Sequence, residues 1–178
     1  MIITIVLLGI ISVILAVVIR SPIDSYFNTV RRSDMVDTVD NAMRRMSREI
    51  QSALPNSIHL PGGANRCVQF IPAEGGGRYR GEQTALSSTD ILDFSVADNR
   101  FDVLGSIGLP PSAGTHYVVV YNTGISPTEA YGGLNRAAIT AASSSVVQIS
   151  ATKFPLESPS RRFHVIPNKT GNTVISQQ

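Results

Sequence analysis

Serine and lysine residues near the end of the chain have the types and spacing of a catalytic motif. Ser150-Ala-Thr-Lys153 and the later Lys169-Thr-Gly171 match the Ser-x-x-Lys and Lys-Thr-Gly patterns of enzymes that acylate their own serine. In those enzymes the serine opens a helix, whereas Ser150 ends an apparent strand at Val146 to Ile149. The two motifs are also too close together, and a Ser-Asp-Asn element is missing. The match therefore predicts no acyl-transfer enzyme.

The sequence evidence for metal, phosphate or thiol chemistry is equally weak. His59, His116 and His164 lie far apart, and no Cys, Asp or Glu stands at metal-ligand spacing beside them. The glycine run Gly75 to Gly77 lacks the phosphate-loop pattern and predicts a flexible hairpin loop. Cys67 is the single cysteine, so no intramolecular disulfide can form, and we expect a small buried hydrophobe there. We expect no catalytic residue, no metal and no cofactor, and hence no enzyme.

Charge does not indicate a nucleic-acid partner. Lys and Arg outnumber Asp and Glu by 15 to 13 among 178 residues. A dedicated nucleic-acid binder has a stronger basic excess. Arg78 and Arg80 flank Tyr79, but two cations and one aromatic ring are ordinary for a loop. We therefore expect no nucleic-acid binding.

The elements that would position any functional residue begin with an apolar N-terminal segment. Met1 to Ile19 contains no charged residue before Arg20. As a helix it spans about 28 Å, close to the roughly 30 Å thickness of bilayer hydrocarbon. We predict a retained transmembrane or filament-core helix over residues 1–20. Its small and hydroxyl residues are the candidates for close helix packing, namely Thr4, Gly9, Ser12 and Ala16.

An amphipathic continuation of this helix is predicted for residues 21–54. Apolar residues recur at steps of three and four from Val36 to Ile50, and the opposite face is charged. Pro55 ends the pattern, because proline disfavours a helical conformation in the residue before it. The apolar stripe needs a partner, so we expect it to pack on a sheet through Val39, Met43, Met46, Ile50 and Leu54.

Residues 55–178 have the texture of strands and turns. Short apolar runs are separated by Gly, Pro, Asn and Ser. We predict a hairpin from Leu92 to Val103 turning at Asp98-Asn99, and further strands at Tyr117 to Tyr121, Val146 to Ile149 and Arg162 to Ile166. The predicted fold class is therefore α+β: a long N-terminal helix packed on a small antiparallel β-sheet domain.

This architecture resembles the type IV pilins and the pseudopilins of type II secretion. Met1 to Ser12 (MIITIVLLGIIS) is similar to the segment that follows their processing site. Three further stretches resemble the MshO-type minor pilins of the mannose-sensitive haemagglutinin pilus, namely Asp37 to Ile58, Asp93 to Gly105 and Asn135 to Thr140. The basic leader, processing site and glutamate of the family correspond to positions before Met1, so we expect no processing within residues 1–178.

The resemblance implies a structural minor subunit that contributes to assembly of a type IV pilus involved in surface adhesion. Its implied partners are other pilin subunits, the inner membrane, an assembly platform and a motor ATPase. It also implies a single-pass bacterial inner-membrane protein with a periplasmic domain, which becomes extracellular in an assembled pilus. Two alternatives stay open. One is a minor pseudopilin of a secretion system; the other is a signal-anchored periplasmic binding or adhesion domain that does not polymerise.

Overall fold

The protein consists of one long helix and a β-rich unit. The computed structural model describes residues 1–60, 68–83, 90–107 and 111–168, apart from the side chains of residues 16–17 and 19–22. Helix α1 runs from Ile2 to Gln51, through Pro22 and close to the predicted end. The chain divides into two compact units, Met1–Arg48 and Glu49–Gln178.

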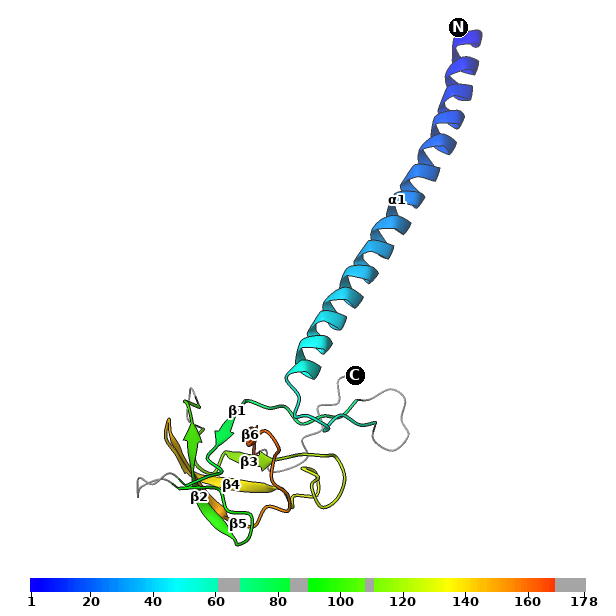
Figure 1. The fold of residues 1–178 in the computed structure, drawn as a ribbon. Helices are drawn as coiled ribbons and strands as arrows, with labels where there is room; N and C mark the ends of the chain where they lie inside the picture. Colours follow the sequence, from blue (N-terminus) through cyan, green and yellow to red (C-terminus); the bar gives the residue numbers. More distant parts are fainter. Residues whose placement is uncertain (61–67, 84–89, 108–110, 169–178) are drawn as a thin grey trace. The chain divides into compact units, whose positions relative to one another are not determined.

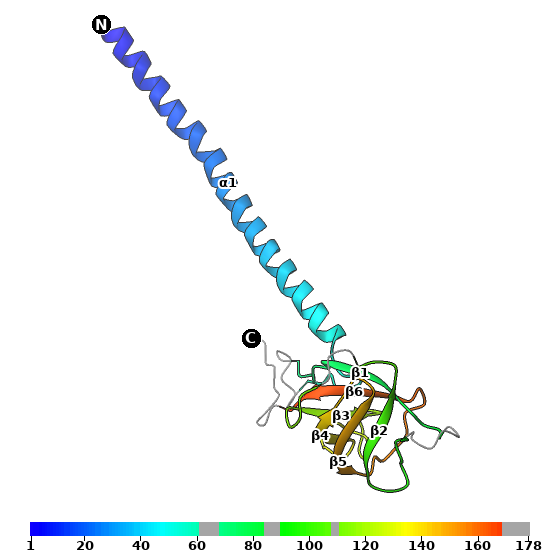
Figure 2. The same ribbon diagram turned by 90° about the vertical axis from the view of Figure 1, so that its left-hand side faces the viewer.

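Six antiparallel strands form the second unit and close into a barrel (Figures 1 and 2). Their order around the barrel is β1-β2-β5-β4-β3-β6, and pairing of β1 with β6 completes the ring. The strands are β1 (Gly75–Tyr79), β2 (Asp98–Leu104), β3 (His116–Val120), β4 (Arg136–Ala142), β5 (Val146–Thr152) and β6 (Arg162–Pro167).

The main hydrophobic core fills the barrel. It is built by inward-facing residues of all six strands, because side chains alternate between the two faces of a strand. Tyr79, Phe101 and Phe163 are the central rings, and each is at most 1% exposed. Phe101 and Phe163 meet edge to face with their centroids 5.3 Å apart. Such aromatic pairs contribute about 0.5–1.5 kcal/mol beyond the apolar area that they bury.

A second, smaller cluster covers the outer face of β3 and β6. Val119 and Ile166 point away from the barrel interior and pack with Leu54, Ile71 and Ala130. The chain that follows α1 is thereby fixed to the barrel, since Leu54 N also donates to Ile71 O at 2.8 Å.

The predicted fold class is wrong. The sequence predicts a long helix packed on a small antiparallel sheet, because the apolar face of a sheet must be covered by another element. Closure into a barrel removes this requirement, since the inner faces of the strands cover one another. Neither core cluster of described residues contains a residue of α1.

The strand predictions are partly confirmed. Strands β3, β5 and β6 lie where the sequence placed them. The predicted hairpin is wrong: Asp98 and Asn99 begin β2 rather than forming a turn. The predicted glycine loop is strand β1, where Gly76 allows close approach of the neighbouring backbone: a Cβ atom there would lie 2.6 Å from Phe163 O. Strand β4, rich in alanine, was missed.

The membrane predictions are also contradicted. Within the described ranges, no helix combines the length and the apolarity needed to cross a bilayer. Such a span requires about 20 predominantly apolar residues. The prediction of a transmembrane helix over residues 1–20 is therefore wrong. The prediction of a single-pass inner-membrane protein with a periplasmic domain, which depends on that helix, is wrong as well.

Candidate functional site

The first part of α1 carries the predicted packing residues. Thr4 Oγ1 donates to the carbonyl oxygen three residues earlier at 2.7 Å, and Ser12 Oγ donates to the one four residues earlier at 2.8 Å. These bonds satisfy the hydroxyl donors within the helix. A Cβ atom added at Gly9 would meet no atom within 4 Å beyond its chain neighbours and the adjacent helix backbone. The side chain of Ala16 lies outside the described residues.

Large apolar side chains around these positions are exposed. Their exposed fractions range from 51% at Ile11 to 101% at Met1. The same surface includes Leu7, Leu8 and Ile14, each more than half exposed. A contiguous apolar surface of this kind indicates an interaction site, because single scattered exposures are ordinary but large patches are not.

The apolar stripe continues into the second part of α1. Val36 and Val39 are each 61% exposed and Met43 is 59% exposed, and together with Met35 and Asp40 they line a shallow depression. Of the remaining residues predicted to pack on the sheet, Met46 is 43% exposed, Ile50 is half-buried and Leu54 is buried. The face from residue 35 to residue 46 thus offers apolar surface to a partner.

The ion pair between Arg44 and Asp40 on the charged face of α1 contributes little to the stability of the helix. Arg44 Nε lies 2.8 Å from Asp40 Oδ2, one helical turn away, and both side chains are more than half exposed. Exposed pairs of this spacing contribute about 0.3–0.5 kcal/mol. The charged side chains therefore make one face of the helix polar, but this ion pair adds little to the stability of the helix.

The three histidines are not brought together. His59 packs edge-on against the Tyr131 ring at 4.7 Å, and His116 Nε2 lies 2.9 Å from Glu74 Oε2. Burial, with a smaller effect of the Arg162 charge, lowers the pKa of His164. The described residues contain no group of three His, Cys, Asp or Glu side chains that could hold a metal ion.

Ser150, the serine of the catalytic-like motif, lies in strand β5. Its Oγ accepts a hydrogen bond from Ala138 N on β4 at 3.1 Å. The hydroxyl therefore takes part in the pairing of β4 with β5, close to the register shift between Ile139 and Ala141. Cys67 and Lys169 to Gly171 lie outside the described residues.

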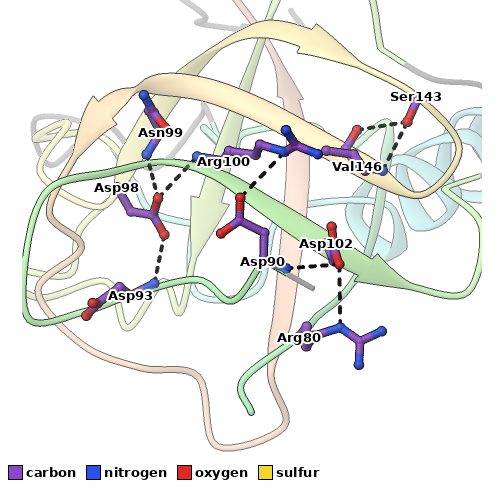
Figure 3. A network of polar contacts seen from close by, with 9 residues as sticks. All are labelled: Arg80, Asp90, Asp93, Asp98, Asn99, Arg100, Asp102, Ser143 and Val146. Carbon is purple, nitrogen blue, oxygen red and sulfur yellow. Dashed lines mark hydrogen bonds and ion pairs between the residues drawn. The ribbon is translucent and has the colours of Figure 1, made fainter. Parts of the chain in front are cut away.

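A polar network on β2 was not predicted from the sequence (Figure 3). Asp98 Oδ2 accepts the backbone N–H of Asp93 at 2.8 Å. Its other oxygen accepts those of Asn99 at 2.7 Å and Arg100 at 3.2 Å. The carboxylate thus fixes the start of β2 and the segment before it.

Farther along β2 the network includes two ion pairs. Asp102 Oδ2 accepts the backbone N–H of Asp90 at 3.1 Å and lies 3.7 Å from Arg80 Nε (Figure 3). Arg100 Nε lies 3.5 Å from Asp90 Oδ2. Burial and then the Asp98 charge raise the pKa of Asp90, while Arg100 opposes the shift. Polar residues at alternate positions 98, 100 and 102 were the sequence signal of this structural network.

Comparison with known proteins identifies no relative. No protein-family model matches the chain, and searches of curated proteins and of solved structures also return no match. The exposed apolar face of α1 is therefore the candidate site on its own physical properties.

Proposed function

We propose that this protein is a structural subunit that assembles through α1 into a filament, as a minor pilin-like subunit of a type IV pilus involved in surface adhesion. The observation that carries the proposal is a 50-residue helix whose described large apolar side chains from Met1 to Met46 are exposed. The type IV pilin resemblance of the sequence supports the same function.

Apolar surface supplies the driving force for such assembly. Removing it from water is worth about 25 cal/mol per Å², so an extended helix face can stabilise a contact by several kcal/mol. The helices of similar subunits are the proposed partners, because they offer the same apolar stripe. When one surface binds a different surface of the next copy and the rotation does not close, repetition builds a filament. An assembly platform and a motor ATPase are further proposed partners, and no catalytic activity is proposed.

A pair of lysine substitutions tests the proposal. Val39→Lys puts a charge on the apolar stripe, whereas Asn41→Lys puts the same charge about 200° around the helix, on the charged side. Both positions are exposed, so neither change leaves a cavity in the single chain. We expect Val39→Lys to weaken assembly at least tenfold and Asn41→Lys to leave it nearly unchanged.

Assembly would be measured on the full chain by sedimentation and by electron microscopy of filaments, alone and together with other pilin subunits. Circular dichroism of both variants would check that the helix is retained. Equal assembly of the two variants would contradict the role of the apolar stripe. A wild-type chain that stays monomeric in every mixture would favour the non-polymerising adhesion domain instead.

A further inference from the structure

A cavity of about 500 Å³ lies on the outer face of the barrel unit. Its volume falls within the range of roughly 300–1,000 Å³ typical of small-molecule sites. The lining combines aromatic rings, amides, hydroxyls and a cation, and its members include Tyr121, Asn122, Pro159, Ser160, Arg162 and His164.

Strand β6 supplies the basic residues of the cavity. Arg162 and His164 are two positions apart, so both point outward, opposite to the buried Phe163 between them. Among the nine lining residues these are the basic ones, and none is a carboxylate. Arg78 of β1 is the register partner of Arg162 and is also exposed. Like charges directly opposite each other repel, so the pair favours a bound anion.

One wall of the cavity is fixed by a reciprocal asparagine contact. Asn56 Nδ2 donates to Asn122 O at 3.0 Å, and Asn122 Nδ2 donates to Pro55 O at 2.7 Å. Gly124 packs against the same wall, because a Cβ atom there would lie 2.9 Å from Asn56 O. The wall is therefore held by contacts of the chain itself, which lowers the entropy lost on binding.

Two lining residues adopt a left-handed backbone conformation. Asn56 has φ 57° and Tyr121 has φ 50°. Asparagine tolerates this region, but a tyrosine there is strained. Strained residues that surrounding structure holds in place cluster at binding sites. The side chain of Tyr121 lines the cavity and is 36% exposed.

We propose that this cavity binds a small acidic sugar. The anionic group lies at Arg162 and His164, the sugar ring lies against Tyr121 and Pro159, and Ser160 bonds a sugar hydroxyl. Arg forms charge-assisted hydrogen bonds with carboxylates and phosphates. This site is independent of the assembly face of α1, since every lining residue belongs to the unit Glu49–Gln178.

Isothermal titration of the full chain tests the proposal with four probes. D-glucuronate and D-glucose 6-phosphate carry the acid on a sugar, D-glucose lacks the acid, and inorganic phosphate lacks the sugar. We expect the two acidic sugars to bind at least tenfold more tightly than glucose and inorganic phosphate. Binding of either control as tight as that of the acidic sugars, or no binding of any probe, would overturn the proposal.

Two variants and a control locate the site. Arg162→Gln should weaken binding of the acidic sugars at least tenfold, whereas Lys153→Gln removes the same charge at an exposed position outside the cavity and should leave it unchanged. Tyr121→Gly should also weaken binding tenfold, because it removes the ring that lines the cavity. Equal affinity of Arg162→Gln and Lys153→Gln would refute the assignment.

Discussion

The hydroxyl of Tyr79 offers a direct test of how the barrel is held together. Tyr79 is fully buried on β1, where its OH accepts from Ser158 N at 3.0 Å and donates to Ser158 O at 3.4 Å. Tyr79→Phe keeps the ring next to Phe94 and Phe101 but removes both hydrogen bonds. Ser158 is itself only 5% exposed, so its N–H is left without a partner. At neutral pH we expect a loss of about 1–3 kcal/mol in the free energy of unfolding.

The same hydroxyl makes the wild-type protein sensitive to alkali. Burial raises the pKa of Tyr79 from 10.0 to about 12, with the Ser158 hydrogen bond acting in the opposite direction. Between these values the unfolded chain has lost the phenolic proton while the folded chain keeps it. The folded state then binds more protons, so its stability falls as pH rises through this window. A difference of two pH units corresponds to about 3 kcal/mol in the free energy of unfolding.

Urea unfolding followed by circular dichroism would measure both effects, at pH 7 and at steps from pH 9 to pH 12. We expect wild type to be more stable than Tyr79→Phe at pH 7 and the difference to vanish by pH 12. Burial also raises the pKa of Tyr131 to about 12, so Tyr79→Phe should keep part of the alkaline loss until Tyr131→Phe is added. If Tyr79→Phe loses as much stability as wild type between pH 10 and pH 12, the reasoning is refuted.

Two further predictions concern the backbone of the barrel unit. Asn122→Ala removes the donor to Pro55 O and the acceptor of Ala130 N, which lie at 2.7 and 2.8 Å, and should cost about 2–4 kcal/mol in thermal or urea unfolding. A loss below about 0.5 kcal/mol would contradict this role. Gly76→Ala should destabilise by more than about 2 kcal/mol, because its Cβ atom would lie 2.6 Å from Phe163 O. Gly75→Ala is the matched control: its Cβ atom meets nothing within 4 Å, and equal effects of the two changes would argue against the close strand contact.

Local sequence patterns predicted those parts of the fold that depend on local interactions. The helix follows from three- and four-residue spacing of apolar side chains, and strands such as β3 follow from a run of β-branched and aromatic residues. Strands β1 and β4 were missed because glycine and alanine have low strand propensity. Their conformation is imposed by neighbours: β1 pairs with β2 and β6, and β4 pairs with β3 and β5. Because β1 completes the ring of strands, the barrel could not be predicted without predicting β1.

Of the two candidate sites, the apolar face of α1 could be predicted from the sequence and the cavity could not. Exposed apolar residues of α1 belong to one continuous helix, so their common face could be read from spacing alone. The cavity brings together residues far apart in sequence, as in the contact between Asn56 and Asn122, which are 66 positions apart. The local sequence does not predict the left-handed φ of Tyr121 either, since tyrosine does not favour that conformation. Both features arise from tertiary contacts.

Closure of the barrel changes how the apolar face of α1 is interpreted. Had the sheet been open, Val39 and Met43 would be explained as the cover of its core. The barrel core is instead complete without them, and both side chains remain more than half exposed. Exposed apolar surface along a helix does not stabilise the single chain, and it is removed from water only when another molecule covers it. In the proposed assembly, a second helix with the same stripe covers this apolar surface along its whole length.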